Sequence, residues 1–276
     1  MMSITAADVN KLRTITGAGM MDCKKALTEA EGDFDKAIEI LRKKGQKVAA
    51  NRSDRDAKEG LVIAKPSQDG TRGALIVLNC ETDFVAKNAD FGIVANTILD
   101  LALEKNPSSL DELKALNYPG SSLTISDKIT EEIGKIGEKI DLSYFGVVAA
   151  PRVFCYNHPG NKLAAMVGFN KETSDDISKD VAMQVAAMAP VALDETSVPE
   201  ELKLKEIEIG KEQAMNEGKP ADMAEKIALG RLNKWFKETT LLNQEFIKDS
   251  KLTVSQYLKS TDKDLTVTEF VRFALN

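Results

Sequence analysis

A pattern that nearly repeats itself constrains this chain more than any other feature of its sequence. In each copy, two apolar strand candidates flank a polar turn, and a helix then runs toward a proline. The first copy occupies residues 60–107, and the second begins at Gly146 and reaches Pro190. The same order of elements at an offset of about 85 to 90 residues predicts two related α+β subdomains. The strand candidates are residues 60–65 and 73–79 in the first copy and the two sides of the His158-Pro159-Gly160 turn in the second.

Three short helices are predicted before the repeat, in residues 1–45. Thr5 followed by Asp8 is a variant of the capping box that starts a helix. The Gly17-Ala18-Gly19 break then separates the first helix from the second, and Asp33 can cap the third. The apolar residues of the first helix that are expected to share one face are Val9, Leu12 and Ile15.

A helical hairpin and a final strand complete the second copy of the pattern. Charged helical segments at 200–217 and 221–238 are joined by Gly218-Lys219-Pro220, and so short a link predicts an antiparallel hairpin. Apolar and polar residues alternate from Leu265 to Leu275, which predicts a strand that completes the second sheet.

These elements combine into an α+β fold with several segments. Residues 46–59 are polar and lack a strong apolar period, so we expect a linker there that is flexible or weakly helical. The predicted segments are a three-helix head at 1–45, a linker at 46–59, and core subdomains at 60–145 and 146–276, the second with a hairpin inserted at about 200–238.

The composition favours a cytoplasmic protein that binds another protein. Apolar stretches fall short of the ~20 residues that a membrane-spanning helix needs, and the first residues lack the pattern of an export signal. A net charge of -6 argues against direct, sequence-independent binding of nucleic acid, which depends on basic surfaces. The three cysteines are far apart in apolar or helical contexts, so we expect reduced, buried thiols.

The residues needed for common catalytic and metal sites are absent from the sequence. His158 is the one histidine, and no nucleophile motif lies near it. One histidine and three scattered cysteines lack the spacing of a zinc site. No phosphate-binding loop occurs, and Gly17-Ala18-Gly19 does not follow a strand. We therefore expect no metal, no cofactor and no covalent chemistry. A catalytic pair of acidic residues that the sequence pattern does not reveal stays open as an alternative.

Three stretches of the sequence resemble elongation factor Ts. They are TGAGMMDCKKAL at residues 16–27, TDFVAKN at residues 82–88, and Ile136-Gly137-Glu138, and the first two strings are highly specific. The likeness continues through the predicted hairpin to the final strand, so it covers nearly the whole chain. It implies a ubiquitin-associated-like three-helix head, a core of two related subdomains, a helical hairpin, and guanine-nucleotide exchange on elongation factor Tu.

The resemblance also assigns roles to particular residues. Those that match a magnesium-displacing motif of the family are Thr82, Asp83, Phe84 and Val85. Those that match contacts with the GTPase are Leu12, Met20, Met21, Asp83, Phe84, Ile136, Gly137, Glu138 and His158. The implied assembly is a heterodimer with elongation factor Tu, and association of two heterodimers stays open.

Each of these residues also has an ordinary structural interpretation. Adjacent methionines can fill a core, but Met20 and Met21 cannot both face the same core on a helix, so at least one should point outward. Thr82 can cap a helix, with Phe84 in the core, whereas an exposed Phe84 would form a wedge. Gly137 can provide backbone freedom in a loop, and His158 can be a plain turn residue.

Three functions are therefore compared. The first is a nucleotide exchange factor, which needs no nucleotide pocket of its own because it acts through reciprocal weakening of binding. The second is a non-catalytic interaction module that binds partners through the three-helix head, which leaves the long core unexplained. The third is an enzyme with an unrecognised site. Release of labelled GDP from elongation factor Tu separates the three.

Overall fold

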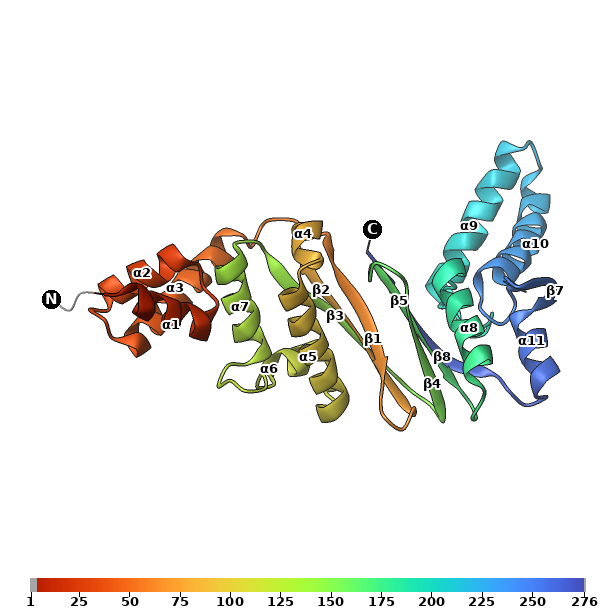
Figure 1. Ribbon diagram of the computed structural model, residues 1–276. Helices are drawn as coiled ribbons and strands as arrows, with labels where there is room; N and C mark the ends of the chain where they lie inside the picture. The colour runs from red at the N-terminus through yellow and green to blue at the C-terminus, as the bar shows by residue number, and fades with distance from the viewer. Residues whose placement is uncertain (1–3, 276) are drawn as a thin grey trace. The chain divides into compact units, whose positions relative to one another are not determined.

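The structure is a computed structural model that describes residues 4–275, and it divides into two compact units. One unit contains residues 4–63, Ile76–Phe145 and Leu275, and the other contains Ala64–Leu75 and Gly146–Ala274. Both combine helices with small sheets, so the protein is a mixed helix-and-strand protein of the α+β kind (Figure 1). Within the described residues, no helix is long and apolar enough to span a membrane.

The first unit begins with three helices, α1 (Ala6–Thr16), α2 (Met20–Glu29) and α3 (Phe34–Asn51). Thr5 and Asp8 form the predicted capping box, and Asp33 caps α3 by accepting from the Lys36 N–H group. Gly17 ends α1 with φ 67°, a left-handed conformation that favours glycine. The predicted helix caps and the predicted break at Gly17 are confirmed. Each depends on groups only three or four residues apart, so the local sequence is enough to specify it.

Helix α3 continues well beyond residue 45, into the segment for which the sequence predicts a linker. It crosses α7 (Ile125–Ile136) where Gly45 faces Gly134. A Cβ atom added at Gly134 would lie 2.7 Å from the Cα atom of Gly45, so the two backbones are in direct contact. Packing against α7 therefore supports the helix through Asn51, where the local sequence gives only weak helical signals.

The first sheet has the order β1-β2-β3, with β1 at Glu59–Pro66, β2 at Arg72–Cys80 and β3 at Ile140–Ala149. Beside it lie α5 (Ala89–Lys105), α7 and the short α6 (Leu110–Ala115) (Figure 1). The sequence predicts that the second subdomain begins at Gly146, and the long segment of the second compact unit also begins at Gly146, within β3. Pro151, which has no N–H group, interrupts the extended segment, and β3 stays with the first sheet.

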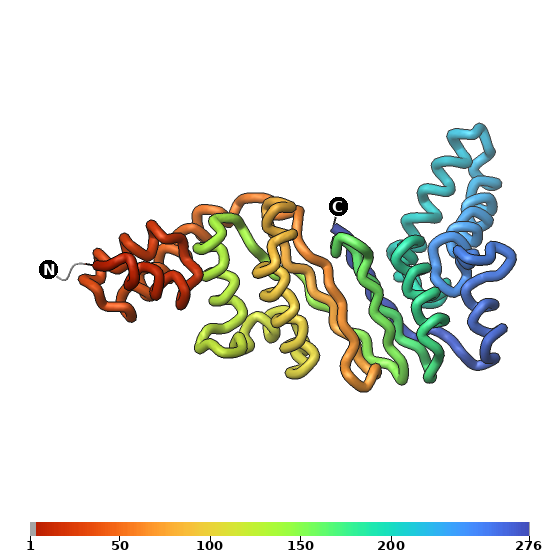
Figure 2. The backbone as a smooth tube through the Cα atoms, viewed as in Figure 1, coloured from red at the N-terminus to blue at the C-terminus, as the bar shows by residue number. Residues whose placement is uncertain are grey.

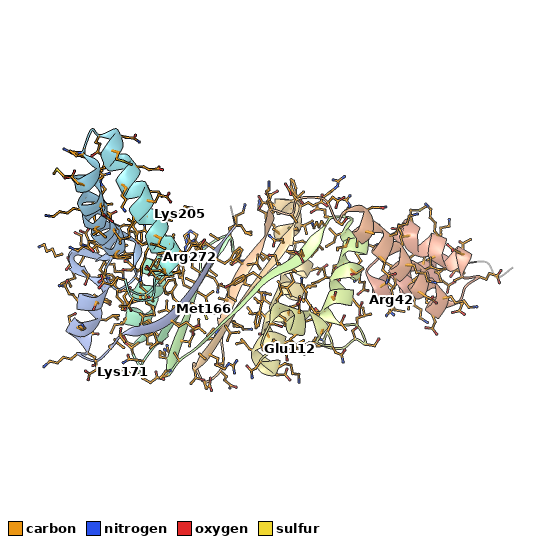
Figure 3. The ribbon with its side chains drawn as sticks, turned by 180° about the vertical axis from the view of Figure 1, so that it is seen from behind. Arg42, Glu112, Met166, Lys171, Lys205 and Arg272 are labelled. Atoms are coloured by element: carbon orange, nitrogen blue, oxygen red, sulfur yellow. The ribbon has the colours of Figure 1, made fainter. Side chains whose placement is uncertain are left out.

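The second sheet is antiparallel in the order β4-β5-β8. Its strands are β4 (Arg152–Asn157), β5 (Leu163–Phe169) and β8 (Val267–Ala274), so the predicted final strand does complete this sheet. Met166 of β5, which is labelled in Figure 3, is fully buried. It opposes Cys155 of β4 on one side and Val271 of β8 on the other. Helix α8 (Asp175–Met188) covers the sheet, and Arg272 of β8 donates from Nε to the Ala186 carbonyl oxygen.

The rest of the second unit is mostly helical. Helices α9 (Glu200–Asn216) and α10 (Ala221–Thr239) form a hairpin, and the chain path through its tip is visible in Figure 2. Ion pairs tie the two helices together, Lys211 with Glu225 at 3.0 Å and Arg231 with Glu217 at 2.8 Å. A small ribbon of β6 (Glu245–Phe246) and β7 (Asp249–Thr253) then leads into α11 (Val254–Thr261).

Candidate functional site

The TDFVAKN segment forms a single exposed turn of helix, α4 (Asp83–Ala86), directly after β2. The Phe84 side chain is 84% exposed, the largest exposed fraction of any large apolar residue in the described chain. Val85 and Ala86 are half-buried, and Phe91 of α5 is buried. Phe84 therefore does not belong to the core, and the interpretation in which it fills the core is wrong.

Asp83 lies beside Phe84 at the first position of α4. Its carboxylate accepts a hydrogen bond from Lys87 Nζ at 2.6 Å, one helical turn further on. This hydrogen bond, together with the negative charge of Asp83, raises the pKa of Lys87. The turn therefore presents an aromatic ring next to an acidic side chain that is paired with a lysine one helical turn further on.

Thr82 adopts the extended conformation of an N-cap residue, but its side chain does not cap α4. Its hydroxyl group donates to Glu138 Oε1 at 2.7 Å, and its backbone N–H donates to Glu138 Oε2 at 3.0 Å. Thr82 therefore occupies the predicted N-cap position, but its side chain makes no capping hydrogen bond. The hydroxyl group instead finds a partner on a distant segment, which no local pattern could indicate.

Glu81, the residue before Thr82, accepts a backbone hydrogen bond from Lys139, the residue after Glu138. Its Oε1 accepts from the Lys139 N–H at 2.6 Å and from Arg52 Nη1 at 2.7 Å, and its side chain is only 14% exposed. Burial by itself raises the pKa of Glu81, but the hydrogen bonds from Lys139 and Arg52 outweigh it and hold the pKa below its ordinary value. The carboxylate is therefore ionised at neutral pH.

Lys139 extends this arrangement to the segment that follows α3. Its Nζ donates to the carbonyl oxygens of Ser53 at 2.6 Å and Arg55 at 2.9 Å. The residues that link the end of β2, the start of β3 and the exit of α3 are called here the carboxylate clamp, and they are Arg52, Glu81, Thr82, Glu138 and Lys139.

Ile136 and Gly137 end α7 close to this clamp in the sequence. Gly137 has φ 80°, and a Cβ atom there would meet nothing within 4 Å, so the left-handed backbone is the reason for glycine. Ile136 is half-buried and lines a groove of about 410 Å³ in the first unit, together with Gly17 and Ile93. The segment thus supplies one wall of an open groove.

The head presents its methionines to solvent at the start of α2. Met20 is 51% exposed and Met21 is 64% exposed, so both point outward. Leu12 is fully buried between the three helices, so it cannot touch a partner directly, and we withdraw it from the contact set. Ile15 was expected to share the buried face with Leu12 but is 57% exposed, because α1 turns this position away from α2 and α3.

Ile93 of α5 is an exposed apolar residue that the sequence analysis missed. It is 61% exposed and lines the same groove as Ile136. Helix α5 is apolar around much of its circumference, so its periodicity gave no signal that one isoleucine faces solvent.

His158 belongs to the second compact unit, apart from the other site residues in the sequence. It is exposed in the turn between β4 and β5, and its Nδ1 lies 3.0 Å from the Tyr156 hydroxyl oxygen. A hydrogen bond to a neighbouring tyrosine and an exposed ring suit a turn residue or a contact residue. Within the described residues, no cluster of His, Cys, Asp and Glu could hold a metal ion.

Comparison with known proteins connects these residues to a family. A family model described as elongation factor TS matches residues 81–276 and so begins at Glu81 of the carboxylate clamp. The chain is 53% identical over 277 residues to elongation factor Ts of Christiangramia forsetii, covering 100% of both chains. It is 53% identical over 274 residues to elongation factor Ts of Amoebophilus asiaticus, covering 98% of each. A third relative, elongation factor Ts of Flavobacterium psychrophilum, is 52% identical over 277 residues, covering 100% of both.

Proposed function

Because this chain belongs to the elongation factor Ts family, we propose that it binds elongation factor Tu and promotes the release of GDP from it. The complex is a heterodimer that acts in the cytoplasm, where translation takes place. Residues 1–45 serve as a ubiquitin-associated-like head, residues 60–145 and 146–276 as the two core subdomains, and the hairpin as an insertion in the second. No covalent chemistry is required of this chain.

The observation that carries the proposal is the exposed ring of Phe84. An apolar ring that is 84% exposed at the tip of a one-turn helix has lost little of its contact with water, so a partner that covers it gains affinity. In the proposed complex, Phe84 enters between helices of the GTPase near its magnesium and phosphate site. Asp83 brings a negative charge to the same place.

This arrangement explains how a protein without a nucleotide pocket accelerates nucleotide release. If the wedge is compatible only with an open conformation of the magnesium and phosphate loops, the wedge and GDP weaken each other's binding by the same factor. A weakening of ~4 kcal/mol speeds release about a thousandfold if the association rate is unchanged. Of the four motif residues, Asp83 and Phe84 reach the GTPase, whereas Thr82 and Val85 hold the turn in place.

Affinity for the GTPase comes from a wider surface of the first unit. Met20 and Met21 are exposed, and methionine side chains adapt readily to an irregular apolar surface. The groove lined by Ile93 and Ile136 adds further apolar contact area. These residues hold the partner while Phe84 opens the nucleotide site.

The experiment follows fluorescent mant-GDP on elongation factor Tu after addition of excess unlabelled GDP. We expect this chain to accelerate the loss of fluorescence at catalytic amounts. The exposed methionines of the head also fit a protein that only binds its partner. A chain that forms a complex with elongation factor Tu but leaves the release rate unchanged would show that it is a non-catalytic interaction module.

A further inference from the structure

We infer that Glu81 and Glu138 are positioning residues for Phe84, and that the carboxylate clamp holds the wedge rigid enough to open the GTPase. The inference rests on the proposed exchange function. It also changes the role of Glu138, which the family resemblance treats as a contact with the GTPase.

The clamp consists of a reciprocal pair of carboxylate-to-backbone hydrogen bonds. Glu138 accepts from the N–H group of Thr82, and Glu81 accepts from the N–H group of Lys139. Residues 81–82 follow the end of β2, and residues 138–139 precede the start of β3, its neighbour in the sheet. Each segment therefore supplies both an acceptor side chain and a donor N–H group to the other, which fixes their relative position at two points.

Further hydrogen bonds close the clamp from the side of the head. Arg52 donates to the same Glu81 oxygen that receives the Lys139 N–H, and Lys139 Nζ reaches the carbonyl oxygens of Ser53 and Arg55. Arg52 directly follows α3, the last helix of the head. The base of the wedge is thus connected to the exit of the head as well as to the sheet.

The wedge needs this support because its own turn contributes little. Helix α4 has four residues, none of them buried, and isolated helices of that length are not stable. Phe84 has no core contact that could fix its direction, since its side chain is 84% exposed. Charge-assisted hydrogen bonds at Thr82, together with the half-buried Val85 and Ala86, therefore restrain the turn that carries the ring.

If Phe84 were held loosely, it would still bind the GTPase but would be less effective in opening the magnesium and phosphate loops. If the turn can bend, the GTPase accommodates Phe84 without opening its magnesium and phosphate loops, and the binding energy is used to order the turn instead. The clamp should therefore govern the maximal rate of GDP release more than the affinity for the GTPase.

The test uses Thr82→Val, which removes one donor of the clamp while keeping the size and branching of the side chain. At saturating concentrations of the exchange factor, we expect mant-GDP release to slow roughly tenfold, with a change of only about twofold in the half-saturating concentration. Glu138→Gln should act in the same direction. Thr82→Ser, which keeps the hydroxyl group, should restore at least half of the maximal rate.

Two controls separate a positioning role from a general structural one. Thr239→Val removes a hydroxyl group that donates to the Trp235 carbonyl oxygen in α10, far from the site in the sequence, and should leave the release rate unchanged. In a Phe84→Ala background, Thr82→Val should have no further effect, because the clamp acts through the ring.

The outcomes distinguish this inference from the proposed function. If elongation factor Tu releases mant-GDP at the wild-type rate with Phe84→Ala, Phe84 is not the wedge and the inference fails, while the exchange function stands. If the wild-type chain does not accelerate release, the proposed function itself fails. If Phe84→Ala is slow but Thr82→Val and Glu138→Gln keep the wild-type maximal rate, only the inference is overturned. An equal slowing by Thr82→Val with and without Phe84 would also overturn it.

Discussion

Replacement of Phe84 by alanine should separate exchange activity from stability more clearly than any other substitution in this chain. The side chain is 84% exposed on a turn with no buried residue. Truncation therefore removes few contacts within the free protein. We expect a change of at most about 0.5 kcal/mol in the free energy of unfolding, typical of exposed positions, and less than about 2 °C in the melting temperature.

The effect on exchange should be large because the ring is buried only in the complex. A phenylalanine side chain that enters an apolar gap buries on the order of 150 Å². At about 25 cal/mol per Å², this contributes ~4 kcal/mol to the opened complex. Alanine keeps the Cβ atom, and the gap closes partly around it, so a loss of ~2 to 3 kcal/mol is expected. Release of mant-GDP should then slow roughly 30- to 150-fold.

A buried phenylalanine provides the matched control. Phe169 of β5 is fully buried in the core of the second unit. Phe169→Ala should cost ~3 to 5 kcal/mol of stability through cavity formation and lower the melting temperature by about 6 to 20 °C. Its exchange rate per folded molecule should stay near that of the wild type.

The assay combines thermal melts of each variant with mant-GDP release, measured well below the melting temperature of Phe169→Ala. A large drop in melting temperature for Phe84→Ala, together with normal exchange per folded molecule, would refute the reasoning. That result would mean that the ring stabilises this chain and does not act on the GTPase.

Three further predictions follow from the described residues. Gly134→Ala should lower the free energy of unfolding by ~1 to 3 kcal/mol in chemical denaturation, because the new Cβ atom would lie 2.7 Å from the Gly45 Cα atom; an unchanged midpoint would contradict the close crossing of α3 and α7. Glu81→Gln should flatten the acid limb of stability: the pKa of Glu81 is lowered from 4.5 in the folded protein, so its contribution is complete above that value and is lost as the pH falls through the lowered pKa. Equal slopes for both proteins in denaturation between about pH 5 and 3 would exclude this linkage. Replacement of the α9–α10 hairpin by a short turn should leave mant-GDP release within about tenfold of the wild-type rate, since none of the motif residues lies within the hairpin, and a greater loss would assign the hairpin a direct role.

Most residues of the candidate site could be identified from the sequence, but the hydrogen bonds that hold the Phe84 turn in place could not. The TDFVAKN string marks Phe84 and Asp83, but the sequence left open whether Phe84 is buried in the core or exposed, and the structure shows that it is exposed. The burial of Leu12 agrees with the apolar face predicted for the first helix, whereas the exposure of Ile15 could not be predicted, because periodicity does not show where the buried part of a helix face ends.

The sequence by itself determined the features that depend on neighbours along the chain. The Thr5 and Asp8 capping box, the end of the first helix at Gly17, and the strands on both sides of the first turn of the repeat all formed where the sequence predicts them. In the capping box and at Gly17 the interacting groups lie within a few residues, and the two strands are joined by a short turn, so the local order of side chains is sufficient.

The tertiary structure alone decided the features that join distant segments. The Thr82 hydroxyl group donates a hydrogen bond to Glu138, which is 56 residues away, and does not cap its own helix. Residues 46–51, for which the sequence predicts a flexible or weakly helical linker, form the end of α3, and Gly45 of this helix packs against Gly134 of α7. Strand β3 joins the first sheet although its sequence continues toward β4. Such contacts form only after the intervening loops have closed, and their partners are selected by shape and charge in three dimensions, which a linear pattern does not record.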